Sequence, residues 1–206
     1  LRDILGCLRV VHGVMRGLVA GSEAAGDWER RTREDLAGLE RAWDFVGRAP
    51  QLGAELKEAA RVFLSKRNWK CIGSGVNYNT ARFSANQLIS GFGRSCAFDV
   101  LEHHTHIDIS AEAAVLTFIA NIWRQGYQGD VLSEVEKLMS HNNIPVIITN
   151  QGDARFDGLK MRVDYGIGRP VMMALPVIKV PKLPEVYAFP LNIVLVQRFM
   201  NILKSA

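Results

Sequence analysis

Short apolar runs separated by helix-like stretches constrain the fold of this chain more than any other feature. From Trp69 onward the runs are Cys71–Ile72, Cys96–Leu101, Ala113–Ala120, Ile144–Thr149, Met161–Tyr165 and Val177–Val180. Runs that are apolar without alternation are typical of strands buried on both faces, as in parallel sheets. Helices between successive strands imply right-handed crossovers. The sequence therefore predicts an α/β fold with a doubly wound, mostly parallel sheet flanked by helices.

The amino-terminal third of the chain has the pattern of amphipathic helices instead. Apolar residues recur there at spacings of three and four in three stripes, Ile4–Leu18, Leu36–Val46 and Leu52–Phe63. The first stripe has no obvious place in a compact α/β unit, so we interpret residues 1–49 as a helical arm or linker that packs on another lobe or subunit. Residues 50–206 form the predicted α/β domain. Three further helices are predicted at Tyr78–Ser90, near Asp130–His141 and at Tyr187–Leu203.

Composition excludes several classes of protein. The chain has 206 residues, 25 basic and 21 acidic side chains, and a net charge of +4 that is spread along it. A nucleic-acid-binding protein concentrates basic residues into a patch, and a membrane-spanning helix needs about 18 or more apolar residues in a row, which this chain lacks. We therefore expect no nucleic-acid partner and no membrane, but a soluble, cytoplasmic protein.

The three cysteines do not form a recognisable framework. Cys7, Cys71 and Cys96 make no CxxC pair, and their number is odd. This usage fits a reducing cytosol, in which cysteines serve as small buried side chains. The sequence implies no metal and no cofactor.

The segment from Ile72 to Ala81 is the sharpest local motif, a predicted strand that runs through Gly-Ser-Gly into a predicted helix. Glycines let the backbone approach a ligand closely, and the amino terminus of a helix favours an anion such as phosphate. The motif is neither GxGxxG nor a phosphate loop that ends in Gly-Lys-Ser/Thr, so no dinucleotide or nucleoside triphosphate is expected. The alternative is a turn that only reverses the chain. The predicted ligand-binding residues are Gly73, Ser74, Gly75, Asn77 and Thr80.

A second candidate segment, Leu101–Asp108, holds three of the five histidines and a glutamate. Such side chains transfer protons near neutral pH. Residues that alternate along an extended segment point to the same face, so His104 and His106 are expected to converge with Glu102. We predict these three residues as catalytic acid and base groups. A metal site and a polar loop or subunit contact are the alternatives.

A third candidate is the loop Asn150–Asp153, which follows a predicted strand. Open α/β sheets bind ligands at the carboxyl ends of their strands, so this loop is placed to contribute. An ordinary turn rich in Asn, Gly and Asp explains the same residues. Similar turn chemistry accounts for Gly166–Pro170.

Several of these segments occur in a familiar order. They are Ile72–Gly75 followed by Asn77, Tyr78 and Ala81, then Ala113–Ala120, then Ser133–His141 with Ile144–Ile148, and finally Tyr187–Leu191. In this order, residues from about 50 to 200 resemble the second sugar isomerase (SIS) lobe of the glucosamine-6-phosphate synthase family. The resemblance implies the SIS fold, a sugar phosphate as ligand, and a pairing either with a second copy of the chain or with a first SIS lobe.

The resemblance also implies a reaction, the aldose–ketose isomerisation of a sugar phosphate by proton transfer through an enediol. The family's ring-opening histidine falls on His106, with His104 as the alternative. The family's helix lysine and catalytic glutamate fall on Gln87 and Ser90, so Glu102 would have to act as the base. The other interpretation is a catalytically degenerate SIS module that binds a phosphosugar or a partner without turnover.

Overall fold

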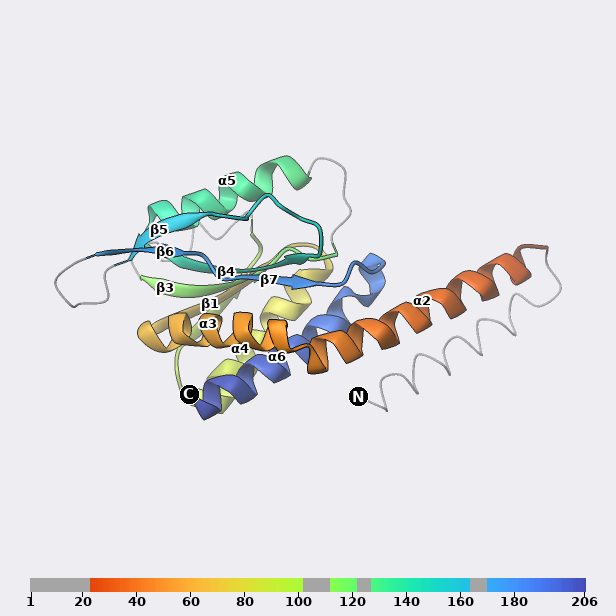
Figure 1. The fold of residues 1–206 in the computed structure, drawn as a ribbon, viewed down its shortest axis with the longest axis horizontal. Helices are drawn as coiled ribbons and strands as arrows, with labels where there is room; N and C mark the ends of the chain where they lie inside the picture. Colours follow the sequence, from red (N-terminus) through yellow and green to blue (C-terminus); the bar gives the residue numbers. More distant parts are fainter. Residues whose placement is uncertain (1–22, 102–111, 122–126, 164–169) are drawn as a thin grey trace.

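The predicted alternation of buried strands and helices is confirmed in the computed structural model (Figure 1). The structure describes residues 23–101, 112–121, 127–163 and 170–206. In chain order the elements are α2 (Glu23–Arg48), α3 (Pro50–Ser65), β1 (Asn68–Gly73), α4 (Val76–Phe92), β2 (Cys96–Asp99), β3 (Ala113–Phe118), α5 (Tyr127–Ser140), β4 (Ile144–Asn150), β5 (Lys160–Val163), β6 (Val171–Ala174), β7 (Val177–Val180), the 3-10 helix η2 (Glu185–Tyr187) and α6 (Ala188–Ser205).

Five strands form the main sheet in the order β2-β1-β3-β4-β7, and every neighbouring pair is parallel. Helices α3 and α4 cover one face of this sheet, with α6 packed against both of them, and α5 covers the other face (Figure 1). Because helices lie on both faces, all six residues of β3 are buried. The apolar runs at Ala113–Phe118 and Ile144–Asn150 therefore correspond to strands buried on both faces, as expected, whereas the edge strands β2 and β7 contain partly exposed residues.

The strand order reverses direction at β1. From β1 the chain passes through α4 to β2 on one side, and the next strand, β3, lies on the other side of β1. At such a reversal the connections leave the sheet in opposite directions, which opens a crevice outside the carboxyl ends of the two central strands. The topology therefore places the most favourable ligand position where β1 and β3 end.

The joint between α2 and α3 belongs to the same core as the sheet. Leu39, Trp43 and Val46 are buried, and α2 packs against α6. The guanidinium of Arg198 donates hydrogen bonds to the carbonyls of Val46 and Ala49 at 2.7 and 2.9 Å. The bond to Val46 satisfies a carbonyl that the end of α2 leaves without an intrahelical partner. The Ala49 carbonyl also accepts a hydrogen bond from the N–H of Gly53 at the start of α3. Residues 39–48 thus share the core of the domain, whereas the stripe at Ile4–Leu18 lies outside the described residues.

One strand prediction needs correction. Met161–Tyr165 does not continue the parallel sheet, because β5 pairs antiparallel with β6 in a separate two-stranded sheet. Side chains of β5 alternate between exposed and buried positions, which is the pattern of a strand packed on one face only. The sequence indicated only a turn before β6, whose residues are largely exposed.

The described cysteines are buried and free, as expected. The sulfur atoms of Cys71 and Cys96 lie 3.8 Å apart on adjacent strands. Burial raises the pKa of the Cys71 thiol, and the neighbouring thiol of Cys96 raises it further, so the protonated form is favoured. Among the described helices, none has the length and apolar character needed to span a membrane.

Candidate functional site

The Gly-Ser-Gly turn connects β1 to α4 at the point where the strand order reverses. A Cβ atom on Gly73 would lie 2.6 Å from the carbonyl oxygen of Asn77, so only glycine fits there. Gly75 has φ 58° and ψ −130°, a conformation that side chains disfavour. It is the N-cap of α4, and no side chain caps the helix. The turn therefore presents the backbone at the positive end of the helix dipole without a side chain of its own in the way.

Ser74 joins this turn to the segment that follows β2. Its hydroxyl oxygen accepts a hydrogen bond from the backbone N–H of Leu101 at 3.1 Å, and the residue is 5% exposed. Leu101 is the last described residue before the segment that holds the predicted acid and base groups. Glu102, His104 and His106 themselves lie outside the described residues, so their roles stay predictions. The hydrogen bond nevertheless anchors the residue before Glu102 at the turn.

Asn77 has a structural position inside the domain. The residue is fully buried, and its amide nitrogen donates to the carbonyls of Phe118 and Ala120 at 3.3 and 2.8 Å. Its amide oxygen accepts a hydrogen bond from the side chain of Asn192 on α6 at 3.0 Å. The sequence predicted Asn77 as a ligand contact, but its amide hydrogen-bonds to protein groups on both sides. Asn77 therefore ties α4 to the end of β3 and to α6.

Thr80, the last of the predicted ligand-binding residues, is also fully buried. It lies one helical turn after Asn77 on the face of α4 that packs inward. Its carbonyl accepts a hydrogen bond from the hydroxyl of Ser84 at 2.7 Å, and its own hydroxyl has no hydrogen-bond partner among the described residues. The structure brings Gly73, Ser74 and Gly75 together at the turn and places the side chains of Asn77 and Thr80 beneath it.

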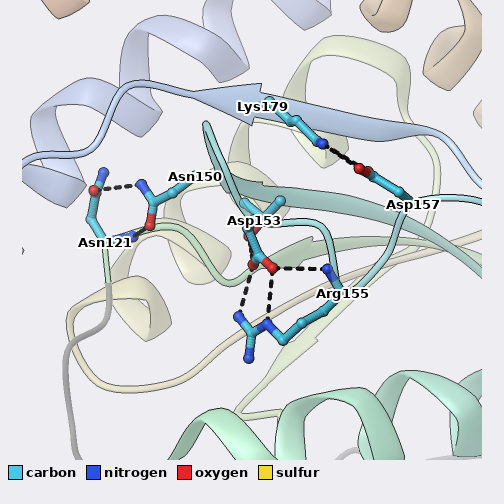
Figure 2. A network of polar contacts seen from close by, with 7 residues as sticks. Asn121, Asn150, Asp153, Arg155, Asp157 and Lys179 are labelled. Atoms are coloured by element: carbon cyan, nitrogen blue, oxygen red, sulfur yellow. Dashed lines mark hydrogen bonds and ion pairs between the residues drawn. The ribbon is translucent and has the colours of Figure 1, made fainter.

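A pair of asparagines closes the edge of the sheet where β3 and β4 end (Figure 2). The backbone N–H of Asn121 donates to the amide oxygen of Asn150 at 2.9 Å, and the amide nitrogen of Asn150 donates to the amide oxygen of Asn121 at 2.7 Å. That oxygen also accepts the N–H of Leu183 at 2.8 Å. The sequence pointed to Asn150 but missed Asn121. Asn121 has φ 61°, which asparagine tolerates better than most residues, so an asparagine directly after an apolar run was the available signal.

The rest of the predicted loop after β4 holds an ion pair (Figure 2). Nε and an Nη atom of Arg155 donate to the two carboxylate oxygens of Asp153 at 2.9 and 2.8 Å, and the Thr149 hydroxyl donates to the same carboxylate at 2.5 Å. Burial raises the pKa of Asp153, but the hydrogen bonds from Arg155 and Thr149 outweigh it and lower the pKa to about 2. The described part of this loop thus neutralises its own charges.

Glu185 is a site residue that the sequence did not indicate. Its carboxylate oxygen Oε1 lies 3.5 Å from the position that a Cβ atom of Gly75 would occupy. The two residues are far apart in the chain, so no local sequence pattern predicts that they lie close together. No group of three His, Cys, Asp or Glu side chains within the described ranges is arranged to hold a metal ion.

Comparison with solved structures identifies the fold. The C-terminal domain of glucosamine-fructose-6-phosphate aminotransferase from Francisella tularensis superposes with a TM-score of 0.58 at 12% identity, over 87% of this chain and 46% of that one. A protein of Escherichia coli CFT073 in complex with a sugar phosphate gives 0.58 at 14% identity, over 87% and 92% of the two chains. The Vibrio vulnificus NanR protein complexed with ManNAc-6P superposes with a TM-score of 0.54 at 15% identity, over 87% of this chain and 68% of that one. This chain has the sugar isomerase (SIS) fold.

The resemblance seen in the sequence is thus confirmed at the level of the fold. This SIS-type chain spans about half the length of the Francisella structure and of a sugar-binding protein from Salmonella typhimurium LT2. No protein-family model matches the chain, and no curated protein matches it in sequence. Gln87 and Ser90, the positions onto which the resemblance in sequence places the family's lysine and glutamate, are both exposed on α4. Ser90 follows the start of the helix by about 20 Å along its axis.

Replacing Asn77 with alanine is expected to lower the free energy of unfolding by about 2–4 kcal/mol, because it leaves two buried carbonyls and the Asn192 amide without their partner. Urea denaturation followed by circular dichroism measures the change. Asn79→Ala is the matched control, since Asn79 is exposed on the same helix and should change stability by less than about 0.5 kcal/mol. Equal effects of the two substitutions would contradict the structural role of Asn77.

The low pKa of Asp153 predicts a pH dependence of stability. Because the folded pKa lies below the ordinary 3.8, the ionised carboxylate stabilises the fold above about pH 5, and this contribution is lost as the pH falls toward 2. Asp153→Asn should therefore lower the free energy of unfolding by up to about 2 kcal/mol at pH 6. At pH 3 the decrease should be about 1 kcal/mol smaller. Urea denaturation at both pH values measures the two differences.

Asp157→Asn is the control for this measurement, because Asp157 forms a more exposed ion pair with Lys179. Its cost at pH 6 is expected to stay below about 1 kcal/mol. If the difference between wild type and Asp153→Asn is the same at pH 6 and pH 3, the ion pair with Arg155 does not depress the pKa of Asp153.

Proposed function

We propose that this chain is a phosphosugar-binding SIS module whose ligand lies at the carboxyl edge of the sheet, between the ends of β1 and β3. The observation that carries the proposal is the uncapped start of α4 at Gly75, located where the strand order reverses. A helix amino terminus at such a point suits the phosphate group of a ligand. Two structures of the same fold, those of the Escherichia coli CFT073 protein and of the Vibrio vulnificus NanR protein, were determined with sugar phosphates.

In this proposal the backbone of Ser74 and Gly75 and the first turn of α4 bind the phosphate group. Asn77 and Thr80 act indirectly, because their buried side chains support the turn from below. Asn121 and Asn150 lie at the same edge of the sheet and fix the ends of β3 and β4. The sugar would extend from the turn toward η2 and toward the segment that begins at Glu102.

We also propose that the module works as a pair, either with a second copy of the chain or with a first SIS lobe. Two observations support a pairing, namely the apolar stripe at Ile4–Leu18 and the length of the Francisella structure, of which this chain spans 46%. The free thiols of Cys71 and Cys96 are consistent with a reducing, cytoplasmic location.

A thermal-shift titration tests the binding proposal. Fructose 6-phosphate, glucose 6-phosphate or glucosamine 6-phosphate is expected to stabilise the protein, by about 2.7 kcal/mol at 100 times the dissociation constant, and inorganic phosphate much less at equal concentration. Gly75→Ala should weaken this binding at least about tenfold, because a side chain disfavours φ 58° and ψ −130° and therefore strains the turn.

Gly93→Ala is the matched control. Gly93 ends the same helix with φ 63° and ψ 18°, an αL conformation that L residues tolerate better than the conformation of Gly75. A Cβ atom there meets nothing within 4 Å, so this variant leaves the turn unchanged. It should bind the sugar phosphate like the wild type. If no sugar phosphate stabilises the wild type, or if both variants bind equally well, the turn is not the phosphate site.

Isomerisation of the bound sugar is a second candidate function. The observation in its favour is the hydrogen bond from Leu101 to Ser74, which anchors the chain at the turn directly before Glu102. Glu102 would take the proton from C2 of the aldose to form an enediol and return it to C1, while His106, or in its place His104, assists ring opening. The exposed Ser90 in place of the family's glutamate favours binding without turnover instead.

Glu102→Gln separates the two functions. If the chain is an isomerase, this variant loses aldose–ketose turnover by at least about a hundredfold and binds the sugar phosphate within about threefold of the wild type. A coupled assay of glucose 6-phosphate against fructose 6-phosphate measures turnover, and Glu112→Gln, an exposed glutamate paired with Lys66, is the control. Undiminished turnover in Glu102→Gln excludes Glu102 as the base, and binding without wild-type turnover indicates the non-catalytic module.

A further inference from the structure

The carboxylate of Glu185 lies directly beside the Gly-Ser-Gly turn. Its Oε1 atom is 3.5 Å from the position of a Cβ atom on Gly75, and the residue is only partly exposed. Within the part of the chain that the structure describes, this carboxylate has neither a hydrogen-bond donor nor a cation as partner. This carboxylate is therefore a close neighbour of a helix amino terminus that lacks a side-chain cap.

The position of Glu185 is fixed by the segment that leads from β7 to α6. The N–H of Leu183 donates to the amide oxygen of Asn121 at 2.8 Å, and the Leu183 side chain is buried. Pro181 and Pro184 restrict the backbone on either side of Leu183. The N–H of Tyr187 donates to the carbonyl of Pro184 at 2.9 Å and closes the 3-10 turn that begins at Glu185. The carboxylate is therefore held at the turn by a stiff segment that is anchored at the end of β3.

The chemistry of a fixed carboxylate limits what it can bind. An ionised carboxylate accepts hydrogen bonds and donates none, and it repels other anions. Arg155, the cation of the loop after β4, is already paired with Asp153. At a site that binds one phosphate group, an unpaired carboxylate is satisfied by a hydroxyl or an ammonium group of the ligand. A second anionic group on the ligand would instead meet like charge.

We propose that Glu185 is a specificity-determining residue that accepts a hydrogen bond from a hydroxyl or ammonium group of the bound sugar phosphate. It thereby selects neutral sugar and amino sugar monophosphates and disfavours ligands that carry a second anionic group. This inference rests on the proposed function, because it assigns the ligand class of the same site.

Isothermal titration calorimetry of the full chain and of Glu185→Gln tests the proposal with four probes: glucosamine 6-phosphate, fructose 6-phosphate, inorganic phosphate and 6-phosphogluconate. Because the variant lacks the charged acceptor, it should bind the tighter-binding of the two sugar phosphates at least about tenfold more weakly than the wild type does. The same loss of negative charge should raise the affinity for inorganic phosphate and for 6-phosphogluconate about threefold. Opposite changes for the two groups of probes are the expected result, and Glu185→Ala should change affinity in the same directions.

Glu136→Gln is the matched control, because Glu136 is exposed on α5 and the substitution removes the same charge away from the turn. Its four affinities should equal those of the wild type. If sugar phosphates bind the wild type and the Glu185 variants bind all four probes like the control, the role of Glu185 is wrong while the proposed function stands. If all four affinities fall together, Glu185 supports the turn and does not discriminate. Failure of every sugar phosphate to bind the wild type overturns both proposals.

Discussion

The buried side chain of Asn77 is the interaction on which the geometry of this domain most depends. One amide connects three elements, since it donates to the carbonyl groups at the end of β3 and accepts from Asn192 on α6, while its own backbone forms the first turn of α4. Parallel strands leave their carboxyl ends without a hydrogen-bonded continuation, so these carbonyls need a partner. By satisfying them, Asn77 sets where α4 begins, and with it the conformation of the turn that precedes the helix.

The fold was predictable from the sequence because its main signals are local. Buried strands such as Ala113–Phe118 appear as continuous apolar runs, and the glycines of the turn mark the strand-to-helix junction. The strand at Met161–Tyr165 was predicted, but its antiparallel pairing with β6 was not, because β6 is largely exposed and carries no buried apolar run of its own. Chain order and the spacing of motifs were sufficient for the resemblance to SIS lobes, although identities of 12–15% carry no information about individual residues.

The site was less predictable, because its polar residues are defined by distant partners. Asn77 and Asn150 were both visible in the sequence, but nothing nearby showed that one binds inward and the other pairs with Asn121. Glu185 could not be predicted for the same reason, because it lies close to Gly75 in space but far from it in the sequence. A side chain that faces a ligand and one that completes an internal hydrogen bond have the same residue type and differ only in what the fold places opposite them.

The charges at the carboxyl edge determine what kind of ligand this arrangement suits. Arg155 and Asp153 neutralise one another, and Lys179 is paired with Asp157, so neither cation is available as a strong counter-charge for a phosphate (Figure 2). The start of α4, which offers about half an elementary charge, is then the source of attraction for an anion at the described turn that does not depend on these two cations. Under the two proposals above, Glu185 beside that helix end weakens the binding of a bare anion, so a ligand gains affinity when it also carries hydrogen-bond donors. The balance of these two groups is the reason for proposing a sugar phosphate, and not phosphate alone, as the ligand class.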